Sequence, residues 1–406
     1  MTPSTIVSST ASYSSNIFLR ILKHSGDQRL LMLTVTAFAI VAAALSALAQ
    51  TETVLHNFNG KDGSYPFSRL IIDMQGNLYG TNGGNPVSPP TAASVIKLDP
   101  TGKLTVLYRQ KPTGICGLCI DNLLQDTQGN LYGTDASAGQ FGNGAVFKVT
   151  PSGSFTVLYS FTGGSDGQNP NDGLVADEQG NFYGTTGLGG AFGQGVVFKV
   201  TPAGAEEVLY SFTGGSDGGE PWGRLLRDSQ GNLLGTTYAD GGLQLSFGVV
   251  FKLTPAGVES VLHSFTGSDG GHPNGDLIFD SKGNLYGTTP SINRGPHGTV
   301  FRVTQEGVFT TLHTFSGSDG FDPRSGVLRD ASGNLFGTTF SGGALGDGVA
   351  YELASDGVLT VLHNFSGGSD GSFPVGGLVF DQSGNLYGTT AYGGTFNDGL
   401  VFKLAF

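Results

Sequence analysis

Short apolar segments of four to six residues alternate with turns along most of this chain. Near the C-terminus, residues 377–380 are apolar, residues 381–384 carry the Asp and Gly of a tight turn, and residues 385–390 are rich in strand-forming side chains. A loop with two glycines then leads to another apolar segment at residues 400–404. This alternation predicts β-strands joined by turns, and the 68 glycines disfavour long helices.

The same pattern recurs at a nearly constant interval. Versions of GNLYGTT begin at seven glycines, which are 53, 51, 51, 52, 50 and 51 residues apart: Gly76, Gly129, Gly180, Gly231, Gly283, Gly333 and Gly384. A fourth apolar segment completes the inner repeats, as at residues 208–212 and 261–265. Four short antiparallel strands at this pitch are typical of β-propeller blades. The sequence therefore predicts an all-β fold, a seven-bladed β-propeller of four-stranded antiparallel blades.

The two ends of the repeat region complement each other. The chain ends on a third strand, at residues 400–404, with no fourth strand after it. Residues 53–58 match the fourth-strand pattern and precede the first full repeat. We expect these two strands to pair and close the ring, because closure removes exposed strand edges. A β-solenoid is the alternative, but it would need capping segments rather than complementary ends.

Residues 1–49 differ from the repeats, which occupy residues 51–406. Positive charges at Arg20, Lys23 and Arg29 precede the apolar run of residues 30–49, which closes on Ala-Leu-Ala. This order is typical of an export signal peptide. The alternative is an uncleaved N-terminal membrane anchor, since about 20 apolar residues can cross a bilayer. Either interpretation predicts an exported protein that is periplasmic, secreted or on the cell surface, with membrane contact only through residues 30–49 if they are uncleaved.

Charge limits the classes of partner. The formal net charge is −12, and residues 1–49 contribute +2, which leaves −14 on the repeats. No Lys/Arg cluster offers the electrostatic footprint that nucleic-acid binding requires. Nucleic acid is therefore not an expected partner.

Four segments recur in one order through residues 51–406: GNLYGTT, a GG loop, GVVFKLTPxG and VLYSFTGGSDG. This set resembles the GloVer tandem repeat of exported bacterial "choice-of-anchor" proteins. The resemblance implies an exported, propeller-like protein. It implies no catalytic residues.

The linkers that lead from one repeat to the next carry the first candidate binding residues. Six linkers contain an aspartate, and these are Asp62, Asp166, Asp217, Asp269, Asp319 and Asp370. A ring of carboxylates would attract cations or accept hydrogen bonds from sugar hydroxyls. The competing interpretation is that Asp-Gly pairs form turns. Calcium needs six to eight converging oxygens, and the spacing shows no such cluster, so no cofactor is expected and the metal question stays open.

The second linker contains Cys116 and Cys119 in place of an aspartate. Outside the cytoplasm, a local disulfide is favoured over redox or metal chemistry. A zinc site lacks its second pair of ligands.

The third position of each fourth strand is Tyr or His, as at His56, Tyr108, Tyr159, Tyr210, His263, His313 and His363. Four histidines suggest a metal site, but they are distributed one to a repeat. A ring with an apolar body and a polar tip at the blade margin explains the pattern better.

Departures from the repeat mark a second candidate site. Trp222, the only tryptophan, lies in a linker between Glu220 and Arg224. A Trp flanked by an acid and a base could stack on a sugar ring and bind its hydroxyls. The alternative is that Trp222 fills a gap between blades. Aromatic residues in the loops between second and third strands weakly favour a binding surface on that face, and they are Phe141, Phe192, Tyr238, Phe247, Tyr392 and Phe396.

The sequence favours an exported, non-catalytic binding or interaction propeller, with a glycan, another cell-envelope component or a protein as its partner. One alternative is an exported carbohydrate-active enzyme, a hydrolase or lyase, that uses two non-repeated carboxylates in one pocket. Its unranked candidates are Glu220, Asp276, Asp322 and Asp347. A structural repeat protein without a small ligand is the other alternative.

Overall fold

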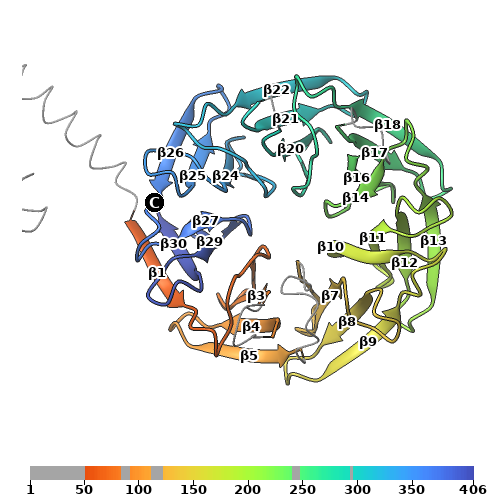
Figure 1. Cartoon of the computed structure of the whole chain (residues 1–406), viewed down its shortest axis with the longest axis horizontal. Helices are drawn as coiled ribbons and strands as arrows, with labels where there is room; N and C mark the ends of the chain where they lie inside the picture. The colour runs from red at the N-terminus through yellow and green to blue at the C-terminus, as the bar shows by residue number, and fades with distance from the viewer. Residues whose placement is uncertain (1–50, 84–91, 111–121, 240–246, 293–295) are drawn as a thin grey trace, which may run out of the picture. The chain divides into compact units, whose positions relative to one another are not determined.

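A computed structural model describes residues 51–83, 92–110, 122–239, 247–292 and 296–406. Residues 51–405 form one compact unit of seven antiparallel sheets, numbered here as blades in chain order, and the sheets stand around a common axis (Figure 1). The predicted seven-bladed β-propeller is therefore confirmed. Among the described residues, no helix is long and apolar enough to span a bilayer. The predicted signal or anchor lies outside the described residues.

Each blade contains four main strands, ordered from the axis outward. Blade 1 contains β2 (Ile71–Ile72), β3 (Leu78–Asn82), β4 (Ser94–Leu98) and β5 (Leu104–Arg109). Blade 2 contains β6 (Leu124–Gln125), β7 (Leu131–Asp135), β8 (Ala145–Val149) and β9 (Phe155–Ser160). Blade 3 contains β10 (Gln168–Ala176), β11 (Phe182–Leu188), β12 (Val196–Val200) and β13 (Glu206–Ser211). Blade 4 contains β14 (Gly219–Pro221), β15 (Leu226–Arg227), β16 (Leu233–Ala239), β17 (Val249–Leu253) and β18 (Glu259–Ser264).

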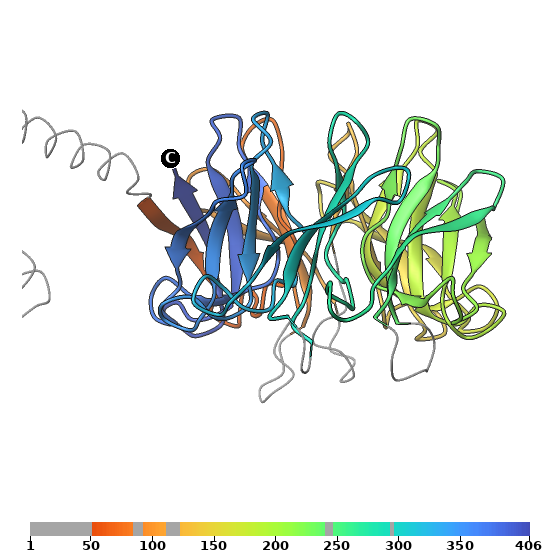
Figure 2. The same cartoon turned by 90° about the horizontal axis from the view of Figure 1, so that it is seen from above.

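The last three blades keep this plan. Blade 5 contains β19 (Ile278–Phe279), β20 (Leu285–Thr289), β21 (Thr299–Val303) and β22 (Phe309–Thr314). Blade 6 contains β23 (Leu328–Arg329), β24 (Leu335–Thr339), β25 (Val349–Leu353) and β26 (Leu359–Asn364). Blade 7 contains β27 (Ser372–Pro374), β28 (Val379–Phe380), β29 (Leu386–Tyr392) and β30 (Leu400–Ala405), and β1 (Thr51–Asn57) supplies its outermost strand. Figure 2 shows the loops gathered at the two ends of the strands.

The ring closes as the sequence predicts. β1 pairs antiparallel with β30, from Thr51 opposite Ala405 to Asn57 opposite Leu400. The innermost strand of blade 7 is shorter than expected, because β28 covers only two residues of the predicted segment 377–380. Gly377 has φ +70°, outside the β region, so the chain bends there before it enters the sheet.

The GNLYGTT motif explains how neighbouring strands pack. Its second glycine lies in the second strand of each blade, and in blades 2 to 7 it lies beside an aromatic ring from the third strand. At Gly184, an added Cβ would lie 2.6 Å from Cζ of Phe198. A side chain at this position would therefore displace the ring. The first glycine closes a turn, because the N–H of Gly384 donates to the carbonyl of Asp381 at 3.1 Å.

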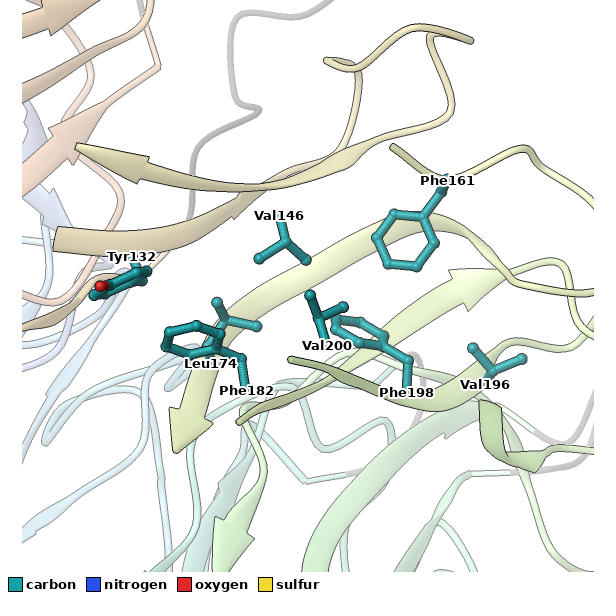
Figure 3. Packing of buried hydrophobic residues seen from close by; sticks show 8 residues of the cluster. All are labelled: Tyr132, Val146, Phe161, Leu174, Phe182, Val196, Phe198 and Val200. Atoms are coloured by element: carbon teal, nitrogen blue, oxygen red, sulfur yellow. The ribbon is translucent and has the colours of Figure 1, made fainter. Parts of the chain in front are cut away.

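The core lies between adjacent blades. Phe161 from blade 2 meets Phe198 from blade 3 edge to face, with ring centroids 5.0 Å apart, and both side chains are fully buried. Figure 3 shows these rings with Val146 from blade 2 and Leu174 from blade 3. Comparable clusters join the other blades, so each blade is stabilised mainly through its neighbours.

Linkers fasten each blade to the one before it. Pro170 in the linker to blade 3 packs on Gly144, which begins the third strand of blade 2, so closely that an added Cβ would lie 2.1 Å from the proline Cδ. The N–H of Asn169 donates to the carbonyl of Asn143 at 2.9 Å. The linkers and the loops between second and third strands therefore meet on one face of the ring.

Candidate functional site

The six linker aspartates lie beside the fourth strands at the outer side of the blades. Each carboxylate pairs with the Tyr or His at the third position of the preceding fourth strand, and the pairs are His56–Asp62 at 3.1 Å, Tyr159–Asp166 at 2.8 Å, Tyr210–Asp217 at 2.9 Å, His263–Asp269 at 3.0 Å, His313–Asp319 at 2.9 Å and His363–Asp370 at 3.3 Å. Each also accepts a backbone N–H from its own linker. The carboxylates are thus held separately, one to a linker. Among the described residues, no three acidic, His or Cys side chains are grouped to hold a metal ion.

Hydrogen bonding sets the charge of these pairs. Partial burial raises the pKa of Asp166, but hydrogen bonds from Thr162 and Tyr159 outweigh it, so the pKa lies below its usual value. Burial lowers the pKa of His263, and the attraction of Asp269 only partly offsets that effect. At neutral pH the imidazole is therefore neutral, and its Nε2–H donates to the carboxylate.

A cavity of about 360 Å³ lies on the ring axis, because every blade except blade 3 contributes lining residues. Arg69 from blade 1 crosses this cavity to Asp276 of blade 5, where the guanidinium and carboxylate are 3.7 Å apart. The Nε–H of Arg69 also donates to the carbonyl of Leu378 at 3.1 Å, and its backbone N–H donates to the Oδ1 of Asn122 at 2.6 Å. Through its side chain and its backbone, this one residue therefore joins four blades at the axis.

A second arginine lines the same cavity. Nε and Nη2 of Arg324 each lie 2.8 Å from Oδ2 of Asp322, and the guanidinium lies 3.7 Å from the centre of the Phe340 ring. Asn274 lines the cavity as well, and its Oδ1 is buried without a hydrogen-bond partner in the described part of the chain. The cavity thus offers donors whose charges are balanced by carboxylates.

The residues predicted around Trp222 are only partly brought together. Trp222 lines the axial cavity, is 46% exposed and packs against Tyr238 with ring centroids 5.5 Å apart. Arg224 instead lines a smaller cavity of about 240 Å³ with Arg69, and its Nε–H donates to the carbonyl of Leu174 at 3.2 Å. Glu220 lines neither cavity. Cys116 and Cys119, with their predicted disulfide, lie outside the described residues.

Sequence reasoning missed Arg69, Arg324 and Asn274, and it left Asp276 unranked. A usable signal was present in the sequence. Arg69, Arg224 and Asp276 occupy equivalent positions in their repeats, each directly before a buried leucine near the start of the blade. These positions differ between repeats and converge at the axis. Comparing the repeats at this position would have identified a charged centre.

What the arrangement can do follows from its groups. An exposed Trp ring beside two arginines and an aspartate provides an apolar platform together with hydrogen-bond donors and an acceptor. Small-molecule sites commonly combine these features in a concave pocket of about this size. Hydroxyl-rich rings match the set, because each hydroxyl both donates and accepts.

Comparisons with solved structures agree with the fold. The chain is similar to virginiamycin B lyase from Staphylococcus aureus, with a TM-score of 0.58, 16% identity, and coverage of 88% of this chain and 99% of that one. It is also similar to the extracellular domains of BT3049 and BT4673 from B. thetaiotaomicron, with TM-scores of 0.55 and 0.56 and identities of 14% and 15%. The match covers 87% and 88% of this chain but 41% of each of those two chains. At these identities the likeness shows the fold alone.

No curated protein matches the sequence. A family model does match, across residues 39–247 and 225–406, and it is described as the Gloeobacter/Verrucomicrobia repeat. The two matches together span most of the chain and cover all seven blades. The tandem repeats predicted from GNLYGTT are therefore confirmed, and the chain belongs to the Gloeobacter/Verrucomicrobia repeat family.

Proposed function

We propose that this protein is an exported, non-catalytic binding propeller whose axial cavity holds a sugar of a glycan or cell-envelope component. The observation that carries this proposal is the cavity itself, where half-exposed Trp222 lines the same space as Arg69 and Arg324. Aromatic stacking and hydrogen bonds to hydroxyls are the two interactions a pyranose requires. The repeats supply the scaffold, and the residues that differ between repeats supply the site.

Export is part of the proposal. The N-terminal charge and apolar pattern supports it, and two of the similar structures are described as extracellular domains. An acidic body of this kind is compatible with uncharged envelope glycans and disfavours polyanions.

The alternative of a carbohydrate-active enzyme requires two carboxylates facing one pocket. In the described part of the chain, Asp276 is the carboxylate that lines the axial cavity, and it is paired with Arg69. Asp322 is likewise engaged by Arg324. This pairing favours binding over acid and base chemistry.

Glycan-array binding of the exported repeat region tests the proposal. Trp222→Ala should reduce affinity for any bound glycan at least tenfold, because a Trp at the centre of a binding site commonly contributes about 2 kcal/mol or more. Phe192→Ala is the matched control, since Phe192 is 60% exposed in an outer loop and does not line the cavity. Equal binding by the two variants would refute the role of the axial cavity.

A further inference from the structure

Six linkers share a pattern in which one variable residue precedes a proline. The constant part is Asp-Gly, then two variable residues, then Pro, and the residue directly before the proline differs in every linker. These variable residues are Tyr65, Asn169, Glu220, His272, Asp322 and Phe373. We call them the pre-proline ring.

All six residues adopt the same unusual backbone conformation. Their φ angles lie between 52° and 63°, in the left-handed region. In each case the backbone N–H donates to a carbonyl in a loop of the preceding blade, for example from Glu220 to Gln194 at 2.9 Å and from His272 to Phe247 at 2.7 Å. The left-handed conformation therefore helps to attach each of these linkers to the preceding blade.

Glycine is the residue expected at such a position. Left-handed φ is costly for any residue with a Cβ, and glycine adopts it freely. In the described part of the chain, glycine occupies 42 positions with positive φ, and other residues occupy seven. Six of those seven are the pre-proline ring. These six positions therefore carry side chains on a strained backbone although glycine is abundant elsewhere in the chain. Such backbone strain clusters at functional sites.

Four of the six residues are connected to the lining of the axial cavity through side-chain contacts. Tyr65 stacks on the cavity residue Phe67, with centroids 6.4 Å apart. His272 stacks on Tyr238 at 4.6 Å, and Tyr238 packs against Trp222 of the cavity wall.

Asp322 and Phe373 are connected to Arg324, which also lines the cavity. Asp322 accepts from Arg324, and Phe373 stacks at 4.8 Å on Phe340, which lies under Arg324. The inner strands β14 and β27, which carry Glu220 and Phe373, border the axis in Figure 1.

We propose that the pre-proline ring is the specificity surface around the cavity, and that it contacts the second and later sugars of a neutral oligosaccharide whose terminal sugar occupies the cavity. This inference rests on the proposed function and extends it to a chain-like ligand. Aromatic members of the ring stack on pyranose faces. Glu220, Asp322 and Asn169 accept hydrogen bonds from hydroxyls.

Charge balance at the axis selects a neutral ligand. Arg69 is paired with Asp276 and Arg324 with Asp322. The ring adds the carboxylate of Glu220 to a repeat region that is already acidic. An anionic sugar would be repelled by this surface and would have to displace an existing ion pair.

Glycine and alanine substitutions separate a binding role from a structural one. Glu220 is the best position, because its side chain has no hydrogen bond or ion pair in the described part of the chain, while its φ is 52°. Glu220→Gly removes both the side chain and the strain, whereas Glu220→Ala removes the side chain and keeps the strain. Asn397→Gly is the matched control, since Asn397 has φ 60° but lies in an exposed loop outside the ring.

Binding is measured by calorimetry with neutral hexasaccharides of glucose, xylose, mannose and galactose, and with hexagalacturonate as the acidic probe. We expect both Glu220 variants to bind the best neutral hexasaccharide about tenfold more weakly, which corresponds to one hydrogen bond to a charged group. The melting temperature of Glu220→Gly should equal or exceed that of the wild type, and that of Glu220→Ala should lie below that of Glu220→Gly. Asn397→Gly should bind normally.

The outcomes distinguish this inference from the proposed function. If both Glu220 variants bind normally and Trp222→Ala loses binding, the role of the pre-proline ring is refuted and the role of the axial cavity stands. A melting temperature several degrees lower in Glu220→Gly assigns the side chain a structural role and also overturns the ring. Binding of hexagalacturonate alone overturns the neutral class. If the wild type binds no hexasaccharide, the proposed function and this inference both fall.

Discussion

Substitution of Phe58 by alanine tests the closure of the ring. Phe58 follows β1, is fully buried, and packs with Leu70 and Ile96 of blade 1 and Val401 of blade 7. Its N–H donates to the carbonyl of Gly399 at 3.0 Å. The contacts with Val401 and Gly399 join the first described strand to the last, so part of the contribution of Phe58 to stability depends on closure of the ring.

The size of the effect follows from burial and chain length. Truncating a buried Phe to Ala costs about 3–5 kcal/mol, including the cavity left behind. Thr51–Ala405 is a unit of about 355 residues, and unfolding entropy near 2.1 cal/mol/K per residue gives about 0.75 kcal/mol/K. Phe58→Ala should therefore lower the melting temperature by about 4–7 °C.

Phe161→Ala is the matched comparison within the ring. Phe161 is also fully buried, and its N–H donates to the carbonyl of Gly144 at 2.9 Å, the equivalent contact between blades 2 and 3. Urea unfolding and calorimetry should give similar losses for both variants, and exposed Phe192→Ala should change stability by less than about 0.5 kcal/mol. A full loss for Phe161→Ala with less than about 1 kcal/mol for Phe58→Ala would refute closure through β1.

Two further predictions concern stability. Gly144→Ala should lower the free energy of unfolding in urea by at least about 3 kcal/mol, because its Cβ would overlap Pro170 and its φ is +107°. Gly142→Ala, with φ +72° and open space around the new Cβ, should cost about 1 kcal/mol, and equal costs would contradict the interlocking of blades. Burial and Asp166 raise the pKa of Glu206 to about 7, above the unfolded value near 4.3, so its favourable contribution is full below about pH 4.3 and is lost as pH rises through 7. Melting temperatures of wild type and Glu206→Gln should diverge between pH 5 and 8, with the wild type falling more steeply, and parallel curves would exclude this linkage.

The fold was predictable because each repeat contains the same local pattern of apolar and turn residues. Apolar runs bounded by Asp and Gly define strands and turns, and the interval between GNLYGTT copies gives the number of blades. Closure followed from complementary ends, since residues 53–58 supply the strand that the last blade lacks. The innermost strand predicted at residues 377–380 was overestimated, because a backbone bend such as that at Gly377 leaves little trace in an apolar pattern.

The pairs between a fourth-strand Tyr or His and a linker aspartate are contacts that the sequence pattern alone did not reveal. The Tyr or His of the fourth strand and the aspartate of the following linker were considered as two separate series. They meet because the linker folds back over six or seven residues, so that Tyr159 reaches Asp166 and His263 reaches Asp269. Their constant separation was visible in the sequence, but the direction of the turn was not.

The axial site was harder to predict for a different physical reason. Arg69 and Asp276 are separated by four blades in sequence, and they lie 3.7 Å apart because closure brings equivalent positions of all blades to the axis. No local motif records such a contact, since the two residues come from different blades and repeated packing constrains the residues around each of them. In a closed ring of repeats, the positions that face the axis are therefore the ones where sequence can vary without loss of the fold. Charged and aromatic residues such as Arg69, Asp276 and Trp222 occupy such positions in this chain, and this is the physical reason to propose a binding site there.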